Sequence, residues 1–204
     1  IADVYTPFTG WHAGTIDSIN GQIGKINLRN NDRVYSVTID NIESYRNGFG
    51  ILGFSGDNYT LIINMKGRFK KGVPIFTGLL TAASNCKIIL NLDLIVDDAT
   101  GVYLGAYSTG SAGNNIAATN RIFITGRIQT TRTGFPCITV QGVTNNTINL
   151  KDLTLINDGT VSPIMTSNVL PENIQIQNVV TNSLVVDANI IEVGQSIIRN
   201  VNYK

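Results

Sequence analysis

The stretch 134–158, with the sequence GFPCITVQGVTNNTINLKDLTLIND, indicates how the rest of the chain folds. Polar and apolar residues alternate on both sides of the pair Lys151-Asp152, and the apolar positions are Ile148, Leu150, Leu153 and Leu155. Alternation with a period of two is typical of a β-strand with one buried face. The change of phase at Asp152 predicts a bend that keeps all four apolar side chains on the inner face.

The same pattern recurs along the chain, so this stretch is one unit of a repeat. The residue expected at each bend is Asn or Asp in six units and Gly in one: Asn41, Asn64, Asn91, Gly126, Asp152, Asn178 and Asn200. Consecutive bends lie 23, 27, 35, 26, 26 and 22 residues apart. The units at Asn64 and Asn91 have one residue fewer before the bend, and the unit at Gly126 has one residue more.

A second, weaker pattern lies between the bends and consists of a Gly followed by a short apolar run. It occurs at residues 48–52, 72–76, 101–104 and 134–138. Each unit is therefore expected to hold two or three short strands joined by polar turns. A single strand cannot bury its apolar face alone, so successive units are expected to pair in parallel, about 4.8 Å apart.

The composition also favours an all-β chain. Of the 204 residues, 43% are hydrophobic and only 14% are charged, whereas about 25% is usual in a soluble domain. β-Branched residues and the 24 Asn favour short strands and tight turns. The formal net charge of +1 gives no strong field for nucleic acid or an anionic membrane, and no apolar run reaches the ~18 residues of a membrane span.

Neither a metal nor a cofactor is expected. The single histidine, His12, and the two separated cysteines have no metal-ligand spacing, and no phosphate-binding Gly loop precedes a helix. Cys86 and Cys137 each adjoin apolar strand residues, so we expect buried free thiols rather than a disulfide.

Residues 1–33 differ from the repeat and are expected to form a separate N-terminal segment. Runs at 15–19 and 22–28 flank Asn20-Gly21, which predicts a hairpin with a type I′ turn. A stack of repeats needs its end covered, so the segment 1–33 is expected to cap the repeat region 34–204. A chain that begins at Ile1 without Met is expected to be a fragment or a processed product.

From about residue 34 to 203 the pattern resembles the right-handed parallel β-helix proteins of the pectate-lyase-like superfamily, most closely at 145–153. The resemblance implies a right-handed parallel β-helix of about seven coils. The low charge, the many Asn and the lack of a signal peptide are similar to bacteriophage tailspike and tail-fibre proteins. That likeness implies a homotrimer that binds host surface glycan and belongs to a virion tail assembled in the host cytoplasm. A secreted or cell-surface protein is the alternative.

The longest interval between bends contains the residues that best suit a sugar ligand. They are Asp97, Asp98, Tyr103, Tyr107, Asn114 and Asn115. A long insertion in one unit projects from the stack, and loops on a rigid scaffold often carry function. Carboxylates and amides can bond sugar hydroxyls, while tyrosine rings cover the apolar sugar face. The sequence therefore predicts a glycan-binding site here, with a solvated loop or a subunit contact as the alternative.

The same interval supplies the best local pair of catalytic candidates, Asp97 and Asp98. Glycoside hydrolysis needs two carboxyl groups on either side of the bond, but consecutive strand residues point to opposite faces. Asp57 and Glu43 could supply a partner carboxylate. The polygalacturonase-like members of the superfamily also carry Asn-Thr-Asp, Gly-His-Gly and Arg-Ile-Lys motifs, and the pectate lyases carry Arg-x-Pro-x-x-Arg; none of these occurs here.

Three functions therefore remain open at this stage. Glycan recognition without catalysis is favoured, a polysaccharide-degrading hydrolase or lyase is one alternative, and a purely structural fibre or adhesin segment is another. The Asn residues at the bends are expected to be structural, because a side-chain amide can bond the equivalent Asn of the next unit.

Two further clusters have structural interpretations. The basic residues Lys66, Arg68, Lys70 and Lys71 are expected to lie in a solvated turn rather than to bind nucleic acid. The apolar residues near the end exceed what one inner face needs, which predicts a subunit interface; they are Leu184, Val185, Val186, Ile190, Ile191 and Val193.

Overall fold

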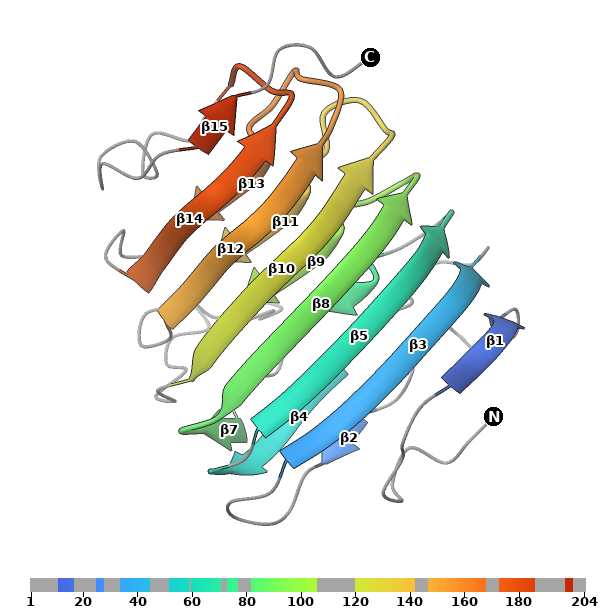
Figure 1. The fold of residues 1–204 in the computed structure, drawn as a ribbon, viewed down its shortest axis with the longest axis vertical. Helices are drawn as coiled ribbons and strands as arrows, with labels where there is room; N and C mark the ends of the chain where they lie inside the picture. The colour runs from blue at the N-terminus through green and yellow to red at the C-terminus, as the bar shows by residue number, and fades with distance from the viewer. Residues whose placement is uncertain are drawn as a thin grey trace, which may run out of the picture.

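Figure 1 shows the computed structural model, which describes residues 11–16, 25–27, 34–44, 52–58, 60–70, 73–76, 82–105, 120–141, 147–167, 173–185 and 197–199. Within these ranges the chain forms fifteen β-strands and no α-helix. The strands are arranged in three sheets, and neighbouring strands are parallel throughout. The predicted all-β class with parallel pairing is confirmed for these residues.

The main sheet contains eight strands whose order in space follows their order in the sequence. They are β1 (Trp11–Ile16), β3 (Val34–Ser44), β5 (Thr60–Phe69), β8 (Lys87–Val96), β10 (Arg121–Thr130), β12 (Thr147–Ile156), β14 (Ile174–Thr181) and β15 (Ile197–Arg199). Figure 1 shows these strands side by side from β1 to β15.

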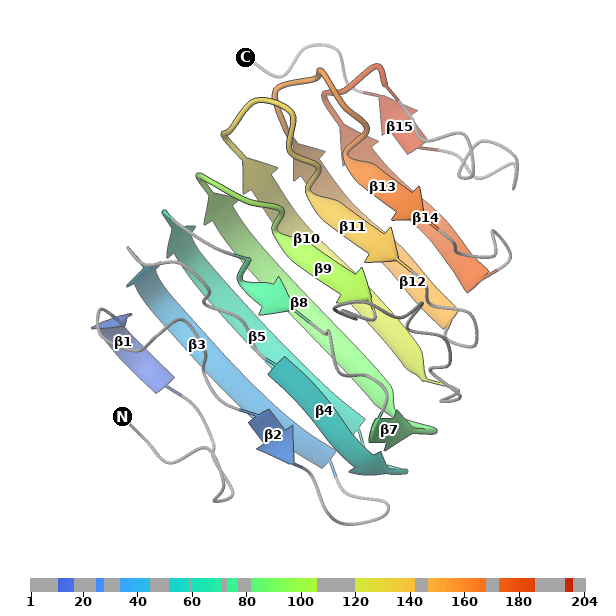
Figure 2. The ribbon, with the colours of Figure 1, turned by 180° about the vertical axis from the view of Figure 1, so that it is seen from behind.

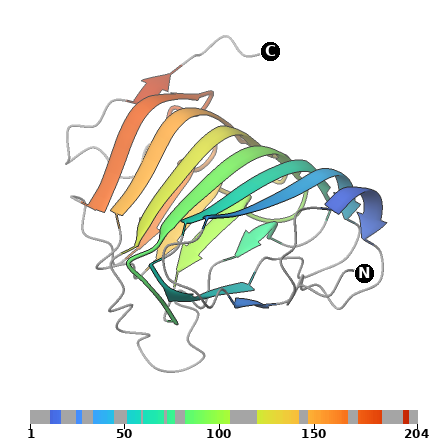
Figure 3. The ribbon, with the colours of Figure 1, turned by 60° about the horizontal axis from the view of Figure 1, so that its bottom comes forward.

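Two smaller sheets lie on one side of the main sheet, as Figures 2 and 3 show. One contains β13 (Ile164–Ser167), β11 (Ile138–Gln141), β9 (Val102–Gly105) and β6 (Ile75–Phe76), in that order. The other contains β2 (Lys25–Asn27), β4 (Leu52–Asp57) and β7 (Ala82–Ser84). A parallel pair requires the chain to return to the same end before the next strand begins, and the short strands lie on these returns.

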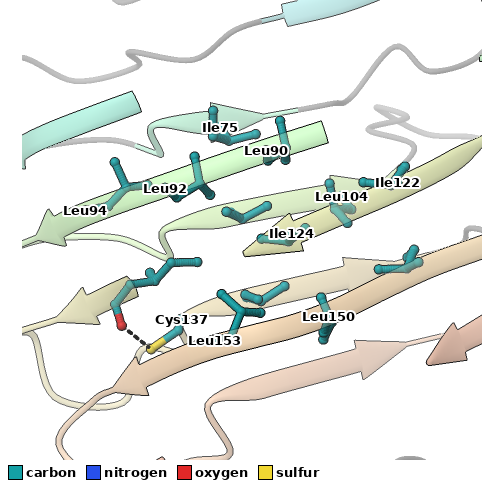
Figure 4. Close-up of a cluster of buried hydrophobic side chains, with 14 of the residues drawn as sticks. Ile75, Leu90, Leu92, Leu94, Leu104, Ile122, Ile124, Cys137, Leu150 and Leu153 are labelled. Atoms are coloured by element: carbon teal, nitrogen blue, oxygen red, sulfur yellow. Dashed lines mark hydrogen bonds between the residues drawn. The ribbon is translucent and has the colours of Figure 1, made fainter. Parts of the chain in front are cut away.

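The core lies between the main sheet and the four-stranded sheet. In β8 burial alternates strictly, and the buried positions are Ile88, Leu90, Leu92, Leu94 and Val96. They form one cluster with inward residues of the smaller sheet such as Ile75 and Leu104, and Figure 4 shows part of this cluster. Burying one Leu or Ile side chain contributes about 1.5–3 kcal/mol, so the shared core binds successive units together.

The bend predicted at Asp152 is present. Ile124 pairs with Leu150 and Gly126 pairs with Leu153, so Lys151 and Asp152 together lie opposite one residue of β10. This is a β-bulge, in which one strand carries an extra residue. Asp152 has a φ of 51°, a left-handed conformation that Asp and Asn tolerate better than most residues. All four apolar residues that the sequence placed inward are buried: Ile148, Leu150, Leu153 and Leu155.

The bend position predicted for Gly126 was wrong. Gly126 lies opposite Leu92 on one side and Leu153 on the other, while Thr125 lies opposite Asn91. The bulge in β12 shifts the alignment of β10 with β12 by one residue after Ile124. The sequence spacing did not show this shift. Gly126 has a φ of +107°, and a Cβ there would lie 2.0 Å from the carbonyl oxygen of Leu92. Only glycine, which has no Cβ, can lie so close to this carbonyl oxygen.

The prediction of an N-terminal hairpin was also wrong. β1 belongs to the main sheet, where it pairs in parallel with β3, and β2 belongs to the three-stranded sheet, where it pairs in parallel with β4. The predicted turn at Asn20-Gly21 lies outside the described residues. Strands in different sheets do not form a hairpin, so the Asn-Gly signal was misleading here. The capping role of residues 1–33 stays a prediction.

Both cysteines are buried and free, as predicted. Cys137 Sγ lies 3.2 Å from the carbonyl oxygen of Ile156 and 3.5 Å from that of Ile128, to which its thiol can donate. Burial raises the pKa of Cys137 to about 12. The thiol therefore stays protonated and acts as a small apolar core residue.

A charge placed in this core tests the inward register. Leu150 is 0% exposed, so Leu150→Asp buries a carboxylate without a partner. We expect the free energy of unfolding to fall by about 4 kcal/mol or more, measured by urea denaturation. Gln175→Asp, on an exposed position of β14, is the control and is expected to cost less than about 1 kcal/mol. Equal losses in the two variants would contradict the register.

Candidate functional site

Asp97 follows β8 and joins three strands of the main sheet. Arg68 of β5 donates from Nε to Asp97 Oδ2 at 2.8 Å and from a terminal nitrogen to Oδ1 at 3.1 Å. Thr131, just after β10, donates its hydroxyl to Oδ1 at 2.9 Å. The hydrogen bond from Arg68 is the main reason that the pKa of Asp97 lies below its ordinary value. Asp97 is therefore an ionised carboxylate that cross-links neighbouring strands.

Asp98 has its own cationic partner. Arg132 donates to an oxygen of Asp98, and the Arg132 guanidinium also lies 4.9 Å from the centre of the Phe135 ring. The two consecutive carboxylates therefore face different arginines. A glycosidase needs one carboxyl group that stays protonated so that it can act as the acid. The lowered pKa of Asp97 favours the ionised carboxylate instead.

Tyr103 lies on β9, on the outer side of the four-stranded sheet. Its hydroxyl donates to the side-chain oxygen of Gln141 on β11. Tyr103 pairs with Thr139, and Thr139 pairs with Met165 on β13. Met165 is 42% exposed, whereas the adjacent strand residues that face the core, such as Val102 and Ile138, are fully buried. We call Tyr103, Thr139, Gln141 and Met165 the tyrosine row.

The predicted site residues are only partly brought together. Asp97 and Asp98 belong to the segment that leads from β8 to β9, and Tyr103 is on β9 itself. Thr139 donates its hydroxyl to that of Thr100 at 3.4 Å, which ties the tyrosine row to this segment. Tyr107, Asn114 and Asn115 lie outside the described residues, as does most of the predicted insertion.

Side-chain amides link neighbouring strands as the sequence predicted, but the bends predicted at Asn64 and Asn91 were wrong. β5 and β8 pair residue by residue, and Asn64 aligns with Thr38 rather than with Asn41. Asn91 donates to the side-chain oxygen of Asn64 at 2.7 Å, and Asn64 donates to the hydroxyl of Thr38 at 3.5 Å. Asn178 donates to a carboxylate oxygen of Asp152 at 2.7 Å. Position 41 lies in β3, but its side chain is outside what the structure describes, and position 200 lies outside the described residues.

The structure adds a hollow that the sequence did not predict. It lies over β3, β5, β8 and β10 on the outer face of the main sheet and has a volume of about 340 Å³. Its lining consists of Thr38, Asn64, Met65, Lys66, Asn91, Leu92, Asp93, Thr125 and Gly126. We call it the amide hollow. The sequence did carry a signal for it, because the units at Asn64 and Asn91 are one residue shorter and Gly126 has no side chain.

The basic cluster lies on a strand rather than in a turn, contrary to the sequence interpretation. Lys66 and Arg68 occupy exposed positions of β5, Lys70 follows its end, and Lys71 lies outside the described residues. Lys66 Nζ lies 3.6 Å from Asp93 Oδ2, and Arg68 is paired with Asp97. The alternation of β5 continues through Phe69, which is buried, and this places the basic residues on the outer face.

Two negative findings apply only to the described residues. They contain no cluster of three or more His, Cys, Asp or Glu side chains that could hold a metal ion. They also contain no helix with the length and apolar character needed to cross a membrane.

Removing the Asp97 carboxylate tests its structural role. Because Arg68 is 52% exposed, we expect Asp97→Asn to cost about 1 kcal/mol of unfolding free energy near neutral pH. The folded pKa of Asp97 is lowered, so its contribution is present above the unfolded pKa of about 4 and is lost as the pH falls through the folded pKa. Urea denaturation at several pH values should show the wild-type advantage shrinking below pH ~4.

The control for this prediction is the double variant Asp97→Asn with Arg68→Gln. If the two groups act as a pair, its cost is smaller than the sum of the two single costs. Additive costs, or a difference that does not depend on pH, would contradict the pairing.

The chain matches no family model, no curated protein and no solved structure.

Proposed function

We propose that the chain is a right-handed parallel β-helix of about seven coils that recognises host surface glycan, as phage tailspike and tail-fibre proteins do. The parallel pairing of sequential strands in the main sheet supports the coil interpretation. The bends at Asp152 and Asn178, with φ of 51° and 54°, support it as well. A virion-tail location after assembly in the host cytoplasm belongs to the same proposal.

The observation that carries the glycan proposal is the tyrosine row. The Tyr103 ring lies on the outer face of β9, and its hydroxyl is held by Gln141. An aromatic ring offers an apolar face to the C–H groups of a sugar, while amide and hydroxyl groups bond its hydroxyls. Tyr103, Gln141 and Thr139 present these groups together on neighbouring strands.

The tyrosine row also has a rigid support. The inward neighbours of its residues, Val102, Leu104 and Val140, are 0% exposed and belong to the core. A side chain fixed on a packed sheet loses little conformational freedom when a ligand binds. This favours recognition of a repeating polysaccharide by a preformed surface.

The arrangement of the carboxylates favours binding over hydrolysis. Asp97 and Asp98 are each paired with an arginine, and the pKa of Asp97 is lowered. A catalytic acid would need a raised pKa. The polysaccharide-degrading alternative would therefore require carboxylates other than this pair.

A structural fibre role is the second candidate, and exposed apolar residues favour it. Leu184 is 63% exposed and Val185 is 43% exposed, just after β14. Exposed apolar residues that gather on a surface often mark an interface. We propose that they contribute to a homotrimer, in which closed symmetry would cover them. The remaining members of the predicted interface, from Val186 onward, lie outside the described residues.

Substitution of Tyr103 tests glycan recognition. We expect Tyr103→Ala to weaken binding to the recognised glycan at least tenfold, equivalent to about 1.4 kcal/mol. Tyr103→Phe keeps the ring but loses the bond to Gln141, so a smaller loss is expected. Binding would be measured on a glycan array and then by calorimetry with the selected oligosaccharide. The matched control is Phe123→Ala, which removes an outward aromatic ring from β10; unchanged binding by Tyr103→Ala would contradict the proposal.

Sedimentation equilibrium tests the trimer. A homotrimer is expected at about three times the chain mass of 22.0 kDa. Leu184→Lys together with Val185→Lys should shift the population toward monomer, because each places a charge where an apolar contact is proposed. A wild-type chain that remains a monomer at micromolar concentration would contradict the trimer.

A further inference from the structure

We infer that the amide hollow is a second ligand site, which takes one neutral sugar unit and is separate from the tyrosine row. The amide hollow lies on the outer face of the main sheet, and the tyrosine row lies on the outer face of the four-stranded sheet. The core fills the space between the two sheets. The two sites therefore face opposite directions, and neither depends on the other.

The hollow exists because neighbouring strands bend in different ways. β3 carries an extra residue opposite β5, between Ile39 and Ile42, and β12 carries an extra residue opposite β10. Strands β5 and β8 and the paired part of β10 align residue by residue, without such an insertion. A bulge bends its strand and re-aims the side chains beside it. The three strands without a bulge between them therefore lie between two bulged ones, and the depression lies over them.

Gly126 deepens this depression. It lies opposite Leu92 and lines the hollow, and the close approach to the Leu92 carbonyl oxygen allows no side chain there. At about 340 Å³ the hollow is at the small end of the ~300–1,000 Å³ range of ligand sites. This size favours a single small ring rather than a large cofactor.

The surface of the hollow is mostly apolar, as in most ligand sites, and its few polar groups are suited to hydroxyl groups. An Asn amide has two N–H donors and an oxygen with two lone pairs. The ladder uses one N–H of Asn64, one N–H of Asn91 and one acceptor position of Asn64. Both amides therefore retain donor and acceptor capacity where they line the hollow. A sugar hydroxyl both donates and accepts, so it can satisfy either half of an amide.

The charges of the lining favour a neutral ligand. Asp93 and Lys66 both line the hollow, and their charged atoms are 3.6 Å apart. An anion would have to approach the carboxylate, and a cation would have to approach the ammonium group. A neutral diol can accept from Lys66 and donate to Asp93 without a like-charge contact. The two side chains are 62% and 47% exposed, so both are accessible from solvent.

The ladder also suits a sugar that belongs to a longer chain. Thr38, Asn64, Asn91 and Thr125 lie at equivalent positions of four successive strands. Neighbouring strands are about 4.8 Å apart, so polar groups recur at that spacing across the sheet. A saccharide chain that crosses the strands could leave one ring in the hollow and extend over the flanking polar side chains.

Side-chain amide resonances provide a direct test. We would titrate ¹⁵N-labelled wild-type protein with the methyl glycosides of glucose, galactose, mannose, rhamnose and N-acetylglucosamine. Glucuronate and glucosamine serve as the anionic and cationic probes. We expect at least one neutral glycoside to shift the side-chain NH₂ signals of Asn64 and Asn91, with the charged probes at least fivefold weaker.

A filling variant locates the site. Thr125→Tyr places a ring at a partly exposed strand position that lines the hollow, and it is expected to weaken binding tenfold or more. Thr147→Tyr is the matched control, because Thr147 is also partly exposed on a main-sheet strand but does not line the hollow. If Thr125→Tyr disturbs the backbone amide spectrum, Asp93→Asn replaces it, with an expected loss of about fivefold or more.

Three results would overturn the inference. They are no shift of Asn64 and Asn91 with any of the five neutral glycosides, equal or stronger binding of a charged probe, and full binding by both the filling variant and Asp93→Asn. Tyr103→Ala should leave the titration unchanged, so failure of the tyrosine row and failure of the amide hollow give different outcomes.

Discussion

Each strand of the main sheet must keep its apolar side chains on the inner face along its whole length, while the sheet curves around the core (Figure 3). β8 achieves this by unbroken alternation from Ile88 to Val96. β12 carries one extra residue opposite β10, which would turn every later side chain outward. The left-handed backbone of Asp152 absorbs the extra residue, and Leu153 is again buried. Because parallel neighbours pair in register, Asn178 of β14 adopts the same conformation.

The same constraint determines the outer surface. Strands that bend with a bulge and strands that bend without one lie side by side, so the outer face cannot be uniformly flat. Polar side chains at these positions are linked from strand to strand, by Asn91 to Asn64 and by Asn178 to Asp152. Such bonds satisfy amide groups that a bend would otherwise leave without partners. Residues that link the strands therefore also line the amide hollow, which lies over strands without a bulge between two bulged neighbours.

The candidate site could be predicted only in part, because its partners come from other strands. The sequence singled out Asp97, Asp98 and Tyr103 by residue type. It could not show that Arg68, 29 residues earlier, pairs with Asp97, or that Arg132, 34 residues later, pairs with Asp98. A carboxylate with an arginine partner serves a different purpose from an isolated one, and that difference depends on strand register. The hollow escaped prediction for the same reason, since its lining comes from four strands.

The sequence by itself determined the all-β class, the repeat, the parallel stacking and the inner face of strands such as β8 and β12, because a period of two within a strand is a local property of the chain. It also determined that Asp152 and Asn178 would occupy bends, since Asp and Asn tolerate left-handed backbone and bond their neighbours. Only the tertiary structure decided that Thr125 rather than Gly126 aligns with Asn91, that β1 and β2 join different sheets, and which outer side chains meet. Those outcomes depend on pairing between residues far apart in the chain, where one extra residue in a neighbouring strand changes every contact that follows.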